Sequence, residues 1–278
     1  MQDCLIDGLL DTLKLLPYLL ATFLLLEFIE HKLKSKKILS QNQKVGPLVG
    51  GLLGALPQCG FSAMAANLFS NKIITAGTLI AVFLSTSDEM LPIMLGENAD
   101  IVSILWIIGI KVAIGIIIGF VVDLIYKRKL ATTPKEISKM CDHEHCECEK
   151  DGIFLSSLKH TLKIGLFVLI ANLLINIIIF LIGEENLSNL LLAKNILTYF
   201  LASLIGLIPN CASSIIITEL YLSGLITTGT MFAGLLTGSG LGILLLFKSN
   251  KNLKENFSIL AVIYFVGVVA GLIVDLFA

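Results

Sequence analysis

Two short motifs occur twice in this chain at the same spacing. Residues 57–60 (Pro-Gln-Cys-Gly) return as 209–212 (Pro-Asn-Cys-Ala), and residues 119–123 (Gly-Phe-Val-Val-Asp) return as 271–275 (Gly-Leu-Ile-Val-Asp). Position 57 lies 152 residues before position 209, and position 119 lies 152 residues before position 271. Because chance matches do not keep register over such a distance, the pattern indicates a duplicated unit. We expect function where the two copies interrupt their apolar runs.

Long apolar runs predict that both copies lie in a membrane. The chain is 56% hydrophobic and 15% charged, whereas soluble domains are roughly half apolar and a quarter charged. A helix needs about 20 apolar residues to cross a bilayer. We therefore predict an all-α integral membrane protein of the cell membrane. The expected spanning helices lie at 9–30, 73–95, 101–126, 164–182, 225–247 and 257–277.

Loop charges predict how the two copies are oriented. Basic residues crowd the segments 32–44, 127–150 and 248–254, whereas 97–100 and 184–185 carry acidic residues. By the positive-inside rule the basic segments are cytoplasmic. When the chain is followed through these loops, the second copy is predicted to be inverted relative to the first, and both termini are predicted to lie outside. The predicted units are a first repeat at 1–130, a cytoplasmic linker at 131–158 and a second repeat at 159–278.

Short apolar pieces account for the remaining segments. Residues 45–56 and 60–70, with their counterparts 196–208 and 212–223, each cover about half of the hydrocarbon thickness. Each pair is either a re-entrant hairpin bent at Pro-x-Cys or two short tilted spans, and both options give five hydrophobic segments per copy. Inverted repeats with broken helices are the architecture of secondary transporters. A proline-kinked helix without a ligand is the alternative.

Polar residues interrupt the apolar runs at two equivalent places. Residues 85–92 read Ser-Thr-Ser-Asp-Glu-Met-Leu-Pro, and the counterpart at 237–240 reads Thr-Gly-Ser-Gly, with glycine in place of a carboxylate. Polar groups inside a bilayer are costly and therefore mark candidate functional positions. Carboxylate, amide and carbonyl oxygens suit Mn²⁺, while thiols favour softer ions. The candidate metal ligands are Asp88, Glu89, Asn67, Glu219, Cys59, Cys211, Asn210, Gln58, Ser87 and Ser239. For the two cysteines, ordinary apolar packing is an equally open interpretation.

Lys111 lies about 15 Å along a predicted spanning helix, near mid-membrane. We expect it to pair with Asp88, Glu89 or Glu219 when the site is empty, so that metal binding displaces an ammonium or a proton. A snorkelling or structurally paired lysine is the alternative. Asp123 and Asp275, close to helix ends, are expected to cap or pair at the interface.

The central linker carries three thiols and two imidazoles. Such a composition predicts a metal-binding tract, although the paired Cys-x-x-Cys spacing of a folded zinc module is missing. We interpret it as a collecting or sensing loop with a preference for soft ions, and a charged loop with incidental Cys and His is the alternative. The linker ligands would be Cys141, His143, His145, Cys146 and Cys148.

Four stretches of the chain resemble the ten-transmembrane heavy-metal exporter family. They read Leu-Pro-Gln-Cys-Gly-Phe-Ser at 56–62, a run ending in Ser-Thr-Ser-Asp-Glu-Met-Leu-Pro at 74–92, Leu-Ile-Pro-Asn-Cys at 207–211 and Gly-Leu-Leu-Thr-Gly-Ser-Gly-Leu-Gly at 234–242. The resemblance extends over both halves and the linker. Members are labelled as manganese transporters or arsenic efflux proteins, which implies export of a metal or metalloid from the cytoplasm.

These patterns together predict a secondary transporter that exports a transition-metal cation, with Mn²⁺ favoured. Efflux of arsenite or of soft metals such as Zn²⁺ and Cd²⁺ is the alternative. An enzyme is disfavoured because all four histidines lie in loops or at a helix edge, and a channel is harder to exclude. We expect no cofactor other than the transported metal. The expected partners are the metal ion and the lipid bilayer, without nucleic acid, and a homodimer is left open.

Overall fold

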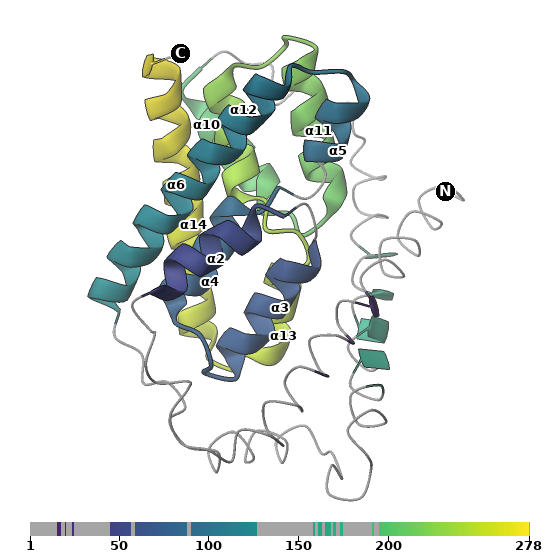
Figure 1. Ribbon diagram of the computed structural model, residues 1–278, viewed down its shortest axis with the longest axis vertical. Helices are drawn as coiled ribbons and strands as arrows, with labels where there is room; N and C mark the ends of the chain where they lie inside the picture. The colour runs from purple at the N-terminus through teal and green to yellow at the C-terminus, as the bar shows by residue number, and fades with distance from the viewer. Residues whose placement is uncertain are drawn as a thin grey trace, which may run out of the picture.

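The computed structural model describes residues 45–56, 59–87, 90–126 and 195–277, with single residues and short pieces between 16 and 24 and between 158 and 191. The described part is helical and contains no strand (Figure 1). Its first-half helices are α2 (Gly46–Gly54), α3 (Cys59–Ser70), α4 (Ala76–Ser85), α5 (Met90–Gly96) and α6 (Ile101–Ile125). Its second-half helices are α10 (Leu197–Gly206), α11 (Cys211–Leu222), α12 (Thr228–Thr237), α13 (Gly242–Ser249) and α14 (Leu253–Phe277).

Four helical segments of the described part are long and apolar enough to cross a membrane. They are Ala76–Gly96, Ile101–Ile125, Thr228–Ser249 and Leu253–Phe277. These segments match four of the six predicted spans, which confirms the prediction of a helical membrane protein. The other two predicted spans, 9–30 and 164–182, lie largely outside the described residues.

The helices repeat with the same offset as the motifs. The first and last residues of α3, α4 and α6 are shifted by 152 positions in α11, α12 and α14. In Figure 1, α6 descends from its start near α5 to the lower left, whereas α14 rises to the C-terminus at the top. The equivalent helices α6 and α14 therefore run in opposite directions in this view.

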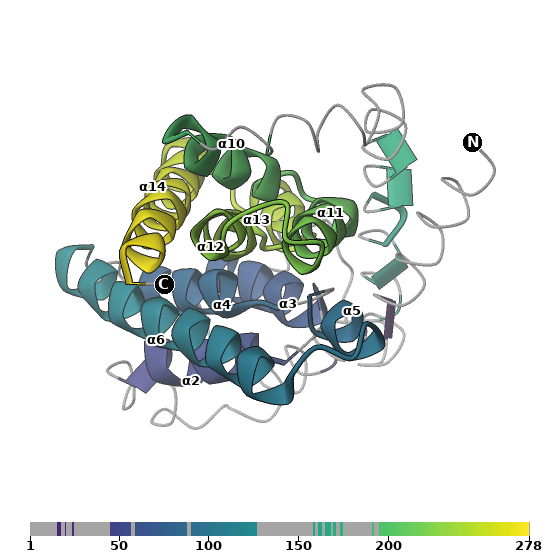
Figure 2. The ribbon, with the colours of Figure 1, turned by 90° about the horizontal axis from the view of Figure 1, so that it is seen from above.

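The two central helices are α4 and α12. Every residue of α4 is buried, and the spans that contain α4 and α12 are 69% and 83% buried, against 22% and 39% for the α6 and α14 spans. Figure 2 shows α4 and α12 near the centre, with α6 and α14 farther out. The outer helices therefore expose most of their apolar side chains at the protein surface, and the central helices are enclosed by protein.

An aspartate of each outer helix holds the beginning of the neighbouring central helix. Asp123 of α6 accepts hydrogen bonds from Thr75 Oγ1 at 2.6 Å and from the Gly77 amide at 2.8 Å, at the start of α4. A carboxylate suits this place because the first amides of a helix lack intrahelical acceptors and carry partial positive charge. Asp275 of α14 accepts the equivalent bonds at the start of α12, where the Gly229 amide lies at 2.6 Å. The predicted structural role of these two aspartates is confirmed.

Small residues bring each outer helix against its central helix. A Cβ added to Gly119 would lie 2.6 Å from the Gly77 carbonyl oxygen, and a Cβ added to Gly115 would lie 2.8 Å from the Ala81 carbonyl oxygen. Both distances are too short for any side chain, so only glycine permits this packing. The second half repeats the arrangement with the same two distances, at Gly271 and Gly267.

The two halves exchange their shorter helices. Helix α3 of the first half packs against α13 of the second, and α11 of the second half packs against α5 of the first. Figure 1 shows both pairs, one at the lower right and one at the upper right. Each half therefore completes its packing with a helix from the other.

The short helices α2, α3, α10 and α11 have 9, 12, 10 and 12 residues. At about 1.5 Å per residue none of them alone crosses a hydrocarbon core of about 30 Å. Asn210 begins α11 by accepting a hydrogen bond from the Ala212 amide at 3.1 Å. Residues 57 and 58, between α2 and α3, lie outside the described residues.

Candidate functional site

Both central spans are interrupted at equivalent positions. Helix α4 ends at Ser85 and α5 begins at Met90, while α12 ends at Thr237 and α13 begins at Gly242. We call residues 86–89 the first break and residues 238–241 the second break. The described residues of both breaks are buried. The structure thus places non-helical backbone and polar side chains inside the two most shielded spans.

The hydroxyl groups at the end of α4 and in the first break donate to backbone carbonyls of the same segment. Ser85 Oγ donates to the Ala81 carbonyl at 2.7 Å, and Thr86 Oγ1 donates to the Val82 carbonyl at 2.7 Å. Ser87 is 1% exposed and donates to the Ser85 carbonyl at 3.3 Å. Ser85 and Thr86 thus give second donors to carbonyls near the end of α4, the Val82 carbonyl already accepting from the Thr86 amide, while Ser87 bonds one of the last carbonyls of the helix.

Lys111 of α6 reaches the first break from the side. Its side chain is 1% exposed, and Nζ donates a hydrogen bond to the Thr86 carbonyl oxygen. An ammonium at this place is favourable because the last carbonyls of a helix carry partial negative charge. Lys111 has the buried position that the sequence predicts, and this acceptor is a backbone carbonyl rather than a carboxylate. Whether Asp88 or Glu89 also contacts it lies outside the described residues.

The second break keeps a hydroxyl but differs in its partner. Ser239 is 0% exposed, and within the described part of the chain its Oγ has no hydrogen-bond partner. Its equivalent in the first break, Ser87, is satisfied. An unpaired buried hydroxyl costs about 1–3 kcal/mol. Ser239 therefore stands out among the predicted ligands.

The predicted pair Asn67 and Glu219 differ in their surroundings. Asn67 on α3 is 4% exposed, and its Oδ1 accepts a hydrogen bond from Asn71 Nδ2 at 3.1 Å. Its own Nδ2 is buried without a partner among the described residues. Glu219 on α11 is exposed. Equivalent sequence positions thus lie in different environments, and only Asn67 has the buried position expected of a ligand.

Asn210 caps the N-terminus of α11, apart from any role as a metal ligand. Its side chain is 3% exposed, and Oδ1 caps the first turn of α11. Cys59 and Cys211 are the first residues of α3 and α11, but the positions of their side chains lie outside the described residues. The same holds for Gln58, Asp88, Glu89 and all five linker ligands. Among the residues that the structure describes, no three His, Cys, Asp or Glu side chains come together.

A buried polar cluster that the sequence analysis did not single out joins the end of α6 to the start of α14. Glu255 is 7% exposed and accepts hydrogen bonds from Tyr126 Oη and from Asn250 Nδ2, each at 2.9 Å. Asn250 Nδ2 also donates to Asn256 Oδ1 at 2.7 Å. Three polar residues within seven positions before an apolar run could have revealed it. The hydrogen bond from Tyr126 to Glu255 in this cluster links the first half to the second.

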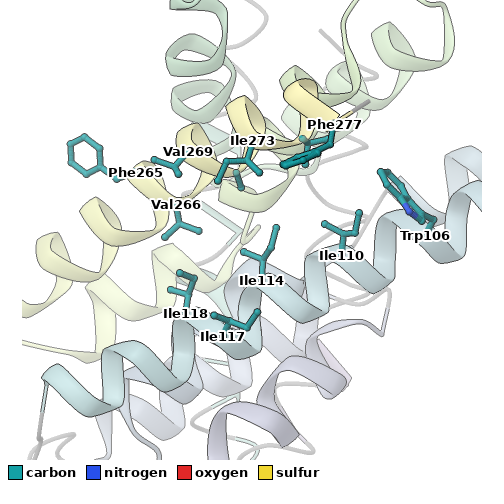
Figure 3. Close-up of a pocket in the computed structure, with 12 residues that line it drawn as sticks. Trp106, Ile110, Ile114, Ile117, Ile118, Phe265, Val266, Val269, Ile273 and Phe277 are labelled. Atoms are coloured by element: carbon teal, nitrogen blue, oxygen red, sulfur yellow. The ribbon is translucent and has the colours of Figure 1, made fainter.

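An apolar groove of about 580 Å³ lies between α6 and α14 (Figure 3). Its lining includes Trp106, Ile114 and Ile118 from α6 and Phe265, Val269 and Phe277 from α14. The lining offers no donor set for a metal ion, because carbon side chains dominate it. The groove fits a lipid-facing surface and is separate from the two breaks.

Comparison with known proteins relates the chain to a family of membrane exporters. The model of a family described as "Putative, 10TM heavy-metal exporter" matches residues 2–182 and 149–278. No curated protein and no solved structure matches the chain. The two matched ranges together cover all but the first residue, so the chain belongs to the ten-transmembrane heavy-metal exporter family.

Proposed function

We propose that this protein is a secondary transporter that exports a transition-metal cation from the cytoplasm, with Mn²⁺ as the favoured substrate. The observation that carries the proposal is the pair of equivalent breaks in the two buried spans, each with polar groups at the interruption. Non-helical backbone at membrane depth is tolerated where it is buried in protein or lines an aqueous cavity. Transporters of this kind bind their substrates and coupling ions at such interruptions.

An inverted arrangement of the two repeats supports alternating access. Equivalent helices α6 and α14 run in opposite directions in Figure 1. The basic loops predict that the first copy ends in the cytoplasm and that the second copy begins there. In this proposal the two breaks face each other across the midplane. In this proposal the packing of α3 on α13 and of α11 on α5 transmits a movement of one half to the other.

The proposed substrate site lies at the first break. Asp88 and Glu89 follow directly after the buried Ser87, and the buried amide of Asn67 keeps an unpaired Nδ2 among the described residues while its Oδ1 accepts from Asn71. Carboxylate, amide and carbonyl oxygens form a hard ligand set that suits Mn²⁺.

Cys59 and Cys211 are candidate additional ligands at the starts of α3 and α11, and the Cys/His linker would collect metal on the cytoplasmic side.

Lys111 is the proposed coupling residue. Its ammonium already lies at the first break, so a divalent cation that binds there meets a positive charge close by. Release of the ammonium from the carbonyl, or loss of its proton, would relieve this repulsion. We expect Lys111→Met to retain metal binding and to lose the pH dependence of transport, whereas an unchanged pH dependence contradicts this role.

Uptake into inside-out membrane vesicles tests the substrate directly. The panel is Mn²⁺, Zn²⁺, Cd²⁺, Fe²⁺ and arsenite, and Asp88→Asn is the site variant. Glu97→Gln is a matched control because this exposed carboxylate lies beyond α5, outside the breaks. We expect Mn²⁺ uptake that Asp88→Asn abolishes and Glu97→Gln retains. No uptake of any member, or normal uptake by Asp88→Asn, refutes the proposal.

Arsenite is the rival substrate, and the two cysteines separate it from Mn²⁺. Trivalent arsenic binds thiols, so replacing Cys59 and Cys211 with serine would abolish arsenite efflux. The same double variant would only weaken Mn²⁺ export, because oxygen ligands remain.

A further inference from the structure

The two halves repeat the packing of the outer helix on the central helix, so equivalent positions of these helices can be compared. The distance from a Cβ added at Gly115 to the Ala81 carbonyl is 2.8 Å, and its counterpart at Gly267 and the Ala233 carbonyl is also 2.8 Å. The aspartate contacts at the other end of the same helix pairs repeat as well. The register of α6 on α4 is therefore the register of α14 on α12.

Lys111 and Ile263 occupy equivalent positions in this register. Lys111 carries its ammonium to the Thr86 carbonyl at the end of α4. The equivalent carbonyl at the end of α12 belongs to Gly238, and the equivalent outer-helix residue, Ile263, is 0% exposed and has no group to donate. The first half thus supplies its own positive charge at a place where the second half supplies none.

The second break also contains a buried hydroxyl group without a hydrogen-bond partner among the described residues. Ser239 Oγ is fully buried and, in the part of the chain that the structure describes, makes no hydrogen bond. Its equivalent Ser87 donates to the Ser85 carbonyl, and the Lys111 ammonium binds the carbonyl of the neighbouring Thr86. Gly240 follows with a φ of 51°, a left-handed conformation that glycine adopts readily. An unpaired hydroxyl therefore lies next to the end of a helix whose last carbonyls attract positive charge.

We propose that the second break binds a dehydrated alkali cation, with Na⁺ as the ion to test, at the place that the Lys111 ammonium fills in the first break. The proposal rests on the proposed transport function, in which this cation would be a second coupling ion beside the proton of Lys111. Its ligands would be Ser239 Oγ and backbone carbonyls at the end of α12. The Lys111 ammonium would then occupy, in the first break, the position that Na⁺ occupies in the second.

The charge of the ligand set favours a monovalent ion. The first half shows that the end of α4 accommodates one positive charge, carried by an ammonium. Where the first break has Asp88, the second has Gly240, so its own residues bring no carboxylate. Neutral hydroxyl and carbonyl oxygens without a carboxylate suit an alkali cation, and unwound carbonyls and helix C-terminal ends coordinate Na⁺ in other transporters. A divalent metal would require more negative charge.

Thermal unfolding of the purified full-length protein in lipid nanodiscs tests the site without any transport assay. NaCl is exchanged for choline chloride at constant ionic strength, and Trp106 fluorescence reports unfolding. A cation that binds only the folded protein raises Tm in a saturable manner. ²²Na⁺ binding to the same samples gives the apparent affinity.

Three variants locate the site. Ser239→Ala removes one ligand, and we expect about tenfold weaker Na⁺ binding. Ile263→Lys supplies the second half with its own ammonium, and we expect a folded protein whose Tm no longer depends on Na⁺. Ser87→Ala is the matched control, because it removes the equivalent hydroxyl from the break that the ammonium already fills, and its Na⁺ affinity should equal that of the wild type.

Several results would overturn the inference. One is a wild-type Tm that does not respond when Na⁺ replaces choline, and another is Na⁺ binding that Ser239→Ala leaves intact. If Ile263→Lys does not fold, Ser239→Ala with Ser87→Ala still decides the question. Metal uptake without a Na⁺ response refutes this site alone, whereas a Na⁺ response without uptake of any metal refutes the proposed substrate and leaves the site in place.

Discussion

The aspartates that hold the starts of α4 and α12 give a quantitative test of the repeated packing. Asp123 accepts hydrogen bonds from a threonine hydroxyl and a glycine amide. Asp275 accepts the same two and a third from Tyr199 Oη at 2.6 Å. The position equivalent to Tyr199 is Pro47, which has no hydroxyl. The two sites therefore differ by one donor.

The number of donors sets the expected loss of stability. A hydrogen bond to a charged group contributes about 1.5–3 kcal/mol, and partial exposure of these sites favours the lower value. We expect Asp275→Ala to cost about 4.5 kcal/mol, Asp123→Ala about 3 kcal/mol and Tyr199→Phe about 1.5 kcal/mol of unfolding free energy. Because Tyr199 acts through Asp275, the double variant Tyr199→Phe/Asp275→Ala should be no less stable than Asp275→Ala alone.

Denaturant unfolding in detergent micelles, followed by the fluorescence of the single tryptophan, measures these differences. The matched surface control is Glu97→Ala, because this carboxylate is exposed and lies beyond the end of α5. For this control we expect a change within about 0.5 kcal/mol. Equal stability of Tyr199→Phe and the wild type, or full additivity in the double variant, would show that the tyrosine does not stabilise the structure through the carboxylate.

Three further predictions concern the outer helices. Gly119→Ala places a methyl group 2.6 Å from a facing carbonyl and should cost about 1–3 kcal/mol of stability, whereas Gly109→Ala, with nothing within 4 Å, should be tolerated; equal melting temperatures would refute the close packing. Trp106 is 51% exposed and lines the groove, so brominated lipids should quench its fluorescence strongly, and emission insensitive to bromine would mean that lipid does not reach the groove. Tyr126→Phe removes a 2.9 Å hydrogen bond to Glu255 and should lower stability by about 1 kcal/mol, and a melting temperature equal to that of the wild type would contradict this link between the halves.

Much of the architecture could be predicted from the sequence, because a bilayer imposes length and repetition on a chain. The constant offset between repeated motifs recurs as the offset between whole helices, from α3 and α11 to α6 and α14. The exchange of α3 and α11 between the halves could not be predicted. A helix that is apolar on all sides carries no sequence pattern that identifies its packing partner.

The candidate site was predictable only in part. The depth of Lys111 follows from its position in an apolar run, and the structure buries it. Its acceptor at Thr86 is a backbone carbonyl, and every residue has one, so residue types alone do not reveal it. Glu219 shows a different limit, because its equivalent Asn67 is buried while Glu219 is exposed. Duplication preserves backbone position, but the packing around each copy decides the environment.

The exchange of helices between the halves also determines the order in which this protein can mature. Helix α3 leaves the ribosome long before α13, yet Ser62 of α3 lies so close to Gly242 of α13 that an added Cβ would be 2.9 Å from its side chain. Contacts between such distant parts of a chain form late. During synthesis the membrane must therefore hold an incomplete first half, with its buried polar groups uncovered, until the last helices arrive. A chain that stops before α13 would lose the packing of a helix near its beginning, and membrane quality control would meet it as an unfinished first half.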